Sequence, residues 1–121
     1  MKTTTKLTAV AAAAIAGASL LTAPPAQANE RVCGGWHGST VRHRGCAELS
    51  GNRFQPEGDF INSTNRTLTF SWAIQQKVNG GWITCAQDAN GRLGPHASWT
   101  GACSWRDRPA TVRTLVSNVR G

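Results

Sequence analysis

Apolar and polar side chains alternate with a period of two over residues 67–78. Every second position in the first part of this segment carries a large apolar side chain: Leu68, Phe70, Trp72 and Ile74. Successive residues of a β-strand point to opposite faces of a sheet, so the pattern predicts a strand with one buried face.

A tight turn is expected directly after this strand. Asn79-Gly80-Gly81 favours a hairpin because Asn and Gly accept positive φ angles. A return strand over 82–86 then follows. A two-residue turn directs Cys85 toward the core and leaves Trp82 outward, near Lys77, whereas a three-residue turn would exchange the two faces. We prefer the two-residue turn because it buries the cysteine.

Residues 87–96 contain Asn-Gly and Gly-Pro pairs and are expected to form a loop. Residues 97–105 alternate again. The face that carries Cys103 also carries Trp99 and Trp105, and we therefore assign both tryptophans to the core.

Two other regions have mixed patterns. Residues 111–119 combine a helical spacing of apolar residues with many β-branched residues, and we choose a strand. Residues 29–55 are interrupted by frequent glycines, and a short strand is expected at 60–62. Glu57 and Asp59 would share a face on a strand, as paired acids do, but their Pro-Gly surroundings favour a loop.

Short strands separated by frequent turn signals are typical of an all-β domain. We expect a small antiparallel β-sandwich or barrel, stapled by two disulfides.

The N-terminus has the composition of a cleavable secretory signal. Lys2 and Lys6 precede an uncharged, alanine-rich stretch at 7–21, and small residues at Ala26 and Ala28 suit a signal peptidase. The stretch is about 15 residues long, too short to span a bilayer. We expect cleavage after Ala28, which leaves residues 29–121 as a single secreted, extracellular β domain without a membrane span.

All four cysteines lie after the predicted cleavage site: Cys33, Cys46, Cys85 and Cys103. An even number in a small exported domain predicts two disulfides. Three pairings are possible, and we favour the sequential one because it closes the shortest loops. The spacings of 13, 39 and 18 residues contain no closely spaced pair, so no metal site is expected.

The chain is basic, with a net charge of +7 that falls to +5 without Lys2 and Lys6. Such a charge favours binding to an anionic partner, for example a wall polymer or an acidic protein, but it also keeps a protein soluble. The basic residues are scattered, and no specific nucleic-acid binding is expected.

The motifs of common hydrolases are missing. No serine lies in a G-x-S-x-G sequence, and no cysteine is left over as a nucleophile. We therefore expect a protein that is not an enzyme and uses no cofactor. A small secreted hydrolase or toxin enzyme is the alternative from another class.

The chain has five tryptophans, and after Trp72, Trp99 and Trp105 are assigned to the core, Trp36 and Trp82 remain as the expected surface aromatics. Trp36 lies in the glycine-rich segment between the first two cysteines, which also contains cations. Aromatic residues and arginine are enriched at binding hot spots. We predict a monomeric, non-catalytic module that binds an extracellular protein or polymer. Its binding residues are expected to be Trp36, His37, Arg42, Arg44 and Trp82.

Ser104-Trp105-Arg106 is locally similar to the Trp-Arg-Tyr stretch of small secreted α-amylase inhibitors of the tendamistat type. That family is also exported, all-β and stapled by two sequential disulfides, so the resemblance implies an inhibitor of another protein. The stretch here is followed by Asp107 instead of tyrosine, and it lies after the fourth cysteine instead of between the first two. No site is carried over from the family.

Overall fold

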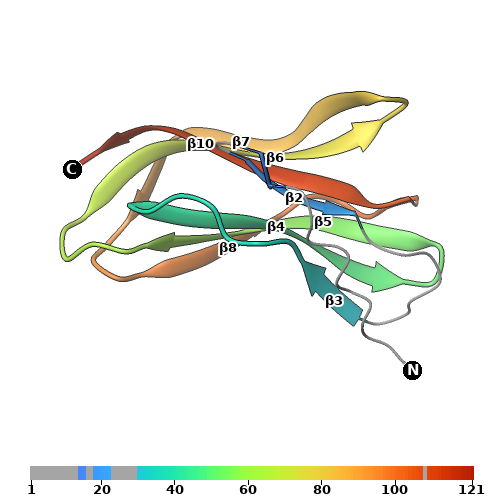
Figure 1. Cartoon of the computed structure of the whole chain (residues 1–121), viewed down its shortest axis with the longest axis horizontal. Helices are drawn as coiled ribbons and strands as arrows, with labels where there is room; N and C mark the ends of the chain where they lie inside the picture. The colour runs from blue at the N-terminus through green and yellow to red at the C-terminus, as the bar shows by residue number, and fades with distance from the viewer. Residues whose placement is uncertain (1–13, 16–17, 23–29, 108) are drawn as a thin grey trace.

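Figure 1 shows the computed structural model of the chain, in which nearly all regular structure is β-strand. The structure describes residues 14–15, 18–22, 30–107 and 109–121. These residues contain no helix, and hence no helix long and apolar enough to cross a membrane.

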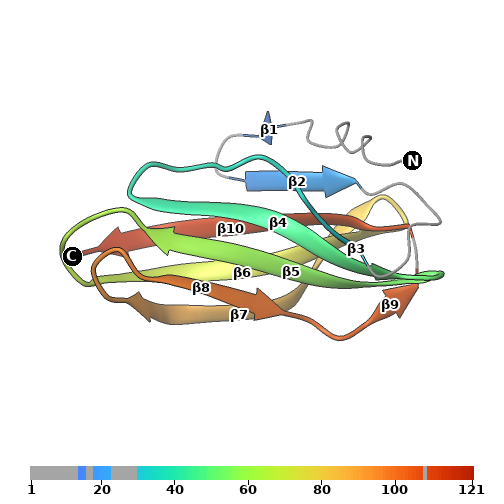
Figure 2. The same cartoon turned by 90° about the horizontal axis from the view of Figure 1, so that it is seen from below.

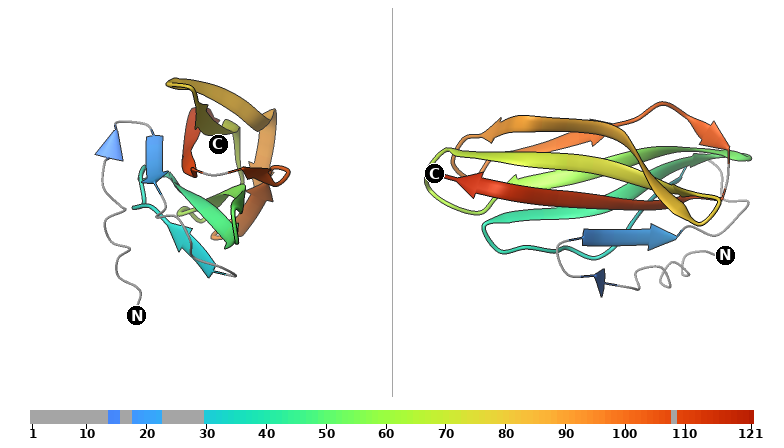
Figure 3. Two further views of the ribbon diagram at one scale, coloured as in Figure 1. Left: turned by 90° about the vertical axis from the view of Figure 1, so that its right-hand side faces the viewer. Right: turned by 90° about the horizontal axis from the view of Figure 1, so that it is seen from above.

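The described residues form ten strands: β1 (Ala14–Ile15), β2 (Ala18–Thr22), β3 (Glu30–Cys33), β4 (Val41–Ser50), β5 (Arg53–Asn62), β6 (Leu68–Val78), β7 (Gly81–Leu93), β8 (Ser98–Ala102), β9 (Arg106–Asp107) and β10 (Thr111–Arg120). One sheet, here called the β6 sheet, has the order β1-β2-β10-β6-β7. The other, the β4 sheet, has the order β3-β4-β5-β8, and β9 pairs with β5. The long strands run along the molecule (Figure 3).

The core lies between the two sheets and consists of apolar side chains from both. Its largest fully buried members are Phe54, Phe60, Phe70, Leu49, Leu68, Ile74 and Val112. These residues occupy alternate positions on their strands, as expected where one face of each sheet is buried.

The strand predicted over 67–78 is confirmed as β6, and the two-residue turn is confirmed as well. Val78 pairs with Gly81, and Asn79 and Gly80 have φ angles of 50° and 83°. Strand β10 shows that residues 111–119 belong to a strand and not a helix.

Both disulfides have the predicted sequential pairing, Cys33–Cys46 and Cys85–Cys103. The first joins neighbouring strands of the β4 sheet, and the second connects the two sheets. Two such bonds fit an oxidising, extracellular environment.

Three sequence-based expectations are wrong. The loop predicted at 87–96 is a strand up to Leu93, because β7 continues past a bulge opposite β6. The loop expected around Glu57 and Asp59 is also a strand: both residues lie on β5, which contains the short strand expected at 60–62 but begins well before it. Trp99 and Trp105 are not core residues: they are 44% and 38% exposed. Trp99 lies on β8, an edge strand, where a side chain directed between the sheets still reaches solvent.

Strands β1 and β2 lie inside the segment predicted to be the signal peptide. Strand β2 pairs with β10 along Thr111–Leu115. The expected cleavage site after Ala28 lies outside the described residues, so cleavage stays a prediction.

Candidate functional site

The segment between β3 and β4 folds back along β4 instead of projecting as an open loop. Gly34 donates its N–H to the carbonyl of Gly45, and His37 and His43 exchange two main-chain hydrogen bonds of 2.9 Å each. Gly38 makes the return possible with a φ of 83°, and a Cβ at this position would overlap the carbonyl oxygen of Val41. With the Cys33–Cys46 disulfide, these bonds fix the segment on the sheet.

The pairing of His37 with His43 determines where Trp36 lies. It places Trp36 across from Arg44 and diagonal to Arg42, on the outer face of the β4 sheet. The guanidinium carbons of Arg44 and Arg42 lie 4.3 and 5.1 Å from the centroid of the Trp36 ring. We call these three residues the Trp36 surface. Two guanidinium groups against one indole form a double cation–π contact.

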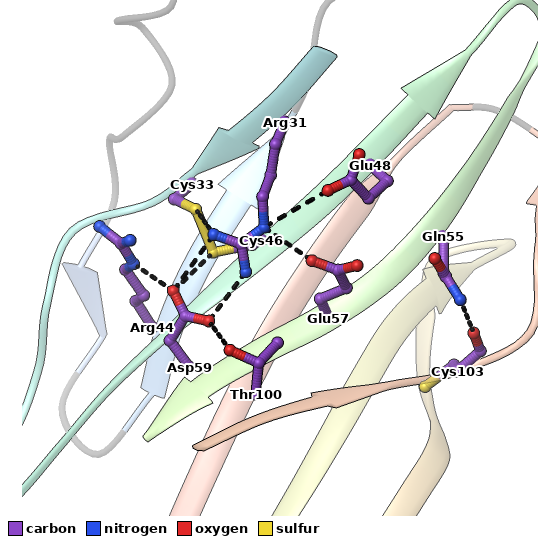
Figure 4. A network of polar contacts seen from close by, with 10 residues as sticks. All are labelled: Arg31, Cys33, Arg44, Cys46, Glu48, Gln55, Glu57, Asp59, Thr100 and Cys103. Atoms are coloured by element: carbon purple, nitrogen blue, oxygen red, sulfur yellow. Dashed lines mark hydrogen bonds and ion pairs between the residues drawn. A yellow bond between two sulfur atoms is a disulfide. The ribbon is translucent and has the colours of Figure 1, made fainter. Parts of the chain in front are cut away.

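Arg44 of the Trp36 surface also belongs to a network of ion pairs and hydrogen bonds, which Figure 4 shows. Arg31, on β3, donates from Nε to Glu57 at 2.7 Å and from Nη2 to Asp59 at 2.8 Å. Arg44 donates from Nε to the other oxygen of Asp59 at 2.8 Å. The hydroxyl of Thr100 on β8 donates to Asp59 at 2.7 Å. The network therefore connects β3, β4, β5 and β8.

This network explains how two carboxylates can be nearly buried on the outer face of a sheet. Glu57 and Asp59 are each 8% exposed. Burial by itself raises the pKa of the Asp59 carboxyl, but the bonds from Arg31, Thr100 and Arg44 outweigh it and hold that pKa below its ordinary value. Asp59 is thus a permanent anion at neutral pH, and it holds Arg44 in place under the indole.

A shallow hollow of about 270 Å³ lies next to this network, with Trp36, Arg44, Asp59 and Thr100 among its lining residues. The Nε of Arg44 is engaged by Asp59, and its Nη groups have no other partner in the described part of the chain. Arg42 is exposed and forms no hydrogen bond or ion pair with any described residue. Both arginines therefore keep N–H donors for an external group.

His37 and Trp82 do not join this surface. The ring of His37 lies beside that of His43, with 6.3 Å between ring centroids. Trp82 lies on the outer face of the β6 sheet, as predicted, with Lys77 at 5.6 Å and Arg113 at 4.3 Å from its ring centroid. The two outer faces point away from each other, so the five predicted binding residues do not form a single site.

Sequence reasoning missed the residues that hold the Trp36 surface in place: Arg31, Glu57, Asp59 and Thr100. A period-two pattern in 53–62 was the available signal, but Pro56 and Gly58 obscured it.

The one group of possible metal ligands among the described residues is Cys33, Cys46 and Asp59, whose ligand atoms lie within 4.8 Å of one another. Both sulfurs are joined in a disulfide, so they offer no thiolate to a metal.

No protein-family model matches the chain, and no match was found among curated proteins or solved structures.

Proposed function

We propose that this chain is a secreted, non-catalytic module that binds an extracellular macromolecule carrying anionic groups, and that the Trp36 surface is its contact surface. The observation that carries the proposal is the placement of two guanidinium groups against one indole ring, each with N–H donors that no described residue engages. Arginine can donate two parallel hydrogen bonds to a carboxylate or phosphate while its flat face rests on an aromatic ring.

Rigidity of the surroundings supports the same proposal. The Cys33–Cys46 disulfide, the main-chain bonds of His37 and the bond from Arg44 to Asp59 hold the surface in a single arrangement before any partner arrives. A preorganised surface loses little conformational entropy on binding. The two sheets serve here as a scaffold for this surface.

The enzyme alternative has little support at this site. Asp59 is bonded to three donors and carries a lowered pKa, so it is poorly suited to transfer a proton.

The inhibitor alternative has little support at Trp105. Trp105 is exposed, but Arg106 is only partly exposed and its Nε is buried, so the two residues are not equally available to a partner.

Binding of the mature protein to wall fractions and to proteins of the culture supernatant tests the proposal. Arg42→Gln should weaken the interaction at least tenfold and reduce its dependence on salt, since it removes an exposed cation without disturbing Asp59. Trp36→Leu should also weaken it. Arg120→Gln removes the same charge from the β6 sheet and serves as the control. Unchanged binding by correctly folded Arg42→Gln and Trp36→Leu variants would refute the proposal.

A further inference from the structure

A second hollow, distinct from the Trp36 surface, opens between the edges of the two sheets. Strand β7 is the last strand of the β6 sheet, and β8 is the edge of the β4 sheet beside it (Figure 2). The Cys85–Cys103 disulfide ties these edges together near one end. Along the strands from this bond lies a cleft of about 210 Å³ lined by Phe70, Trp72, Asp88, Asn90, Arg92 and Trp99, among others.

Two indole rings form the apolar wall of this cleft. The ring centroids of Trp72 and Trp99 are 5.0 Å apart, and both rings pack against Phe60. Glycines make room for them: a Cβ at Gly91 would lie 2.6 Å from Cδ1 of Trp72, and one at Gly101 would lie 2.8 Å from Cη2 of Trp99. Trp99 nevertheless stays 44% exposed. A large aromatic face held rigidly at the mouth of a cleft is a stacking surface.

Polar side chains form the opposite wall, on β7. The bulge in β7 across from Phe70 and Trp72 changes the direction of the side chains there. One oxygen of Asp88 accepts the main-chain N–H of Asn90 at 2.8 Å, which fixes the carboxylate. Its other oxygen, the amide of Asn90 and the guanidinium of Arg92 have no partner among the described residues. The wall therefore offers both acceptors and donors, and its lining includes one acidic and one basic residue, with no formal net charge.

We propose that this cleft binds a neutral saccharide ring. A pyranose has an apolar face of C–H groups that can stack on an indole, and hydroxyl groups around its rim that both donate and accept hydrogen bonds. The cleft presents this combination, with aromatic rings on one side and mixed polar groups without net charge on the other. A purely apolar ligand would leave Asp88 and Arg92 desolvated.

The proposed saccharide cleft does not depend on the proposed function of the Trp36 surface. Strand β8 lies between the cleft and that surface. Trp99 is a lining residue of both hollows, one on each side of that strand. A glycan with neutral and acidic units would thus find complementary groups on both sides of one edge of the molecule.

An array of defined neutral oligosaccharides, with gluco-, manno-, galacto-, xylo- and N-acetylglucosamine series, tests this proposal on the mature protein. Each series that binds is then titrated by tryptophan fluorescence. Wild-type protein should bind at least one series, Trp99→Ala should lose at least tenfold in affinity, and Asn90→Ala should lose several-fold. Trp105→Ala removes another exposed indole outside the cleft and should have no effect.

Asn90→Ala keeps the test valid if Trp99→Ala does not fold, because Asn90 is exposed and most substitutions of exposed residues change stability little. Absence of binding to every series at millimolar concentration would overturn the proposal. So would saccharide binding that persists unchanged in the Asn90→Ala and Trp99→Ala variants. If Arg42→Gln weakens binding to a wall fraction while the array stays negative, the Trp36 surface is supported and the saccharide cleft is refuted.

Discussion

Mild acid should destabilise this protein because a histidine is buried in the neutral form between the sheets. His43 on β4 is 2% exposed, its Nδ1 lies 2.7 Å from the hydroxyl of Thr114 on β10, and its ring stacks near Phe60. Burial, and secondarily the neighbouring charge of His37, lowers the pKa of His43 from 6.5 to about 4.

The sign and size of the effect follow from this pKa difference. As the pH falls below 6.5, His43 becomes protonated in the unfolded chain, but in the folded protein it stays neutral until about pH 4. The free energy of unfolding therefore decreases throughout this pH window. A difference of about 2.5 pKa units corresponds to roughly 3 kcal/mol of unfolding free energy. For a domain of this size, Tm should fall by roughly 15 °C.

Urea unfolding, followed by tryptophan fluorescence from neutral to about pH 4.5, measures this loss. His43→Asn keeps a nitrogen near Thr114 but cannot titrate, so its stability should be lower at neutral pH and nearly independent of pH in this window. His96→Asn is the matched control, because His96 is exposed and has a φ of 55°, which asparagine accepts. A flat profile for wild type, or an unchanged slope in His43→Asn, would show that His43 is not the responsible group.

Three further results are expected. Asn62→Ala removes a fully buried amide whose two N–H groups are shared among three main-chain carbonyls, so urea unfolding should show a loss of about 3 kcal/mol. Arg31→Ala leaves Glu57 and Asp59 with fewer donors and should cost about 2 kcal/mol at neutral pH. That difference should shrink as the pH falls through the lowered pKa of Asp59, because a protonated carboxyl has no ion pair to lose. N-terminal sequencing of exported protein should begin at Asn29, and a retained Met1 would contradict the signal-peptide prediction.

Local sequence patterns were sufficient to predict the β6–β7 hairpin and the pairing of the disulfides. The alternation in residues 67–78 predicts β6 because one face of that strand is buried along most of its length. Asn79 and Gly80 predict the turn because their φ preferences depend on the residues themselves and not on distant contacts. The pairing of the cysteines follows the shortest loops: Cys33–Cys46 joins the paired strands β3 and β4, and Cys85–Cys103 joins the two sheets at residues that are close in the sequence.

The extent of β4 and β5, and the burial of their polar residues, could be determined only from the tertiary structure. Glycine and proline in these strands weaken the local signal, and the strands are stabilised by pairing with β3 and β8 on either side. Glu57 and Asp59 look like solvated loop residues in the sequence. They are buried because Arg31 reaches them from β3, a contact that no local pattern contains.

The exposure of the tryptophans was also decided by the assembled sheets. The alternating pattern correctly predicted that Trp99 points between the sheets. It could not show that β8 is an edge strand, where a side chain that points between the sheets still contacts solvent. The sequence alone determined that this is an all-β chain with two disulfides and a cationic, aromatic segment near its first cysteine. The order of strands within the sheets determined which of those aromatic rings are accessible and which charges face them, because burial depends on neighbours that lie far apart in the chain.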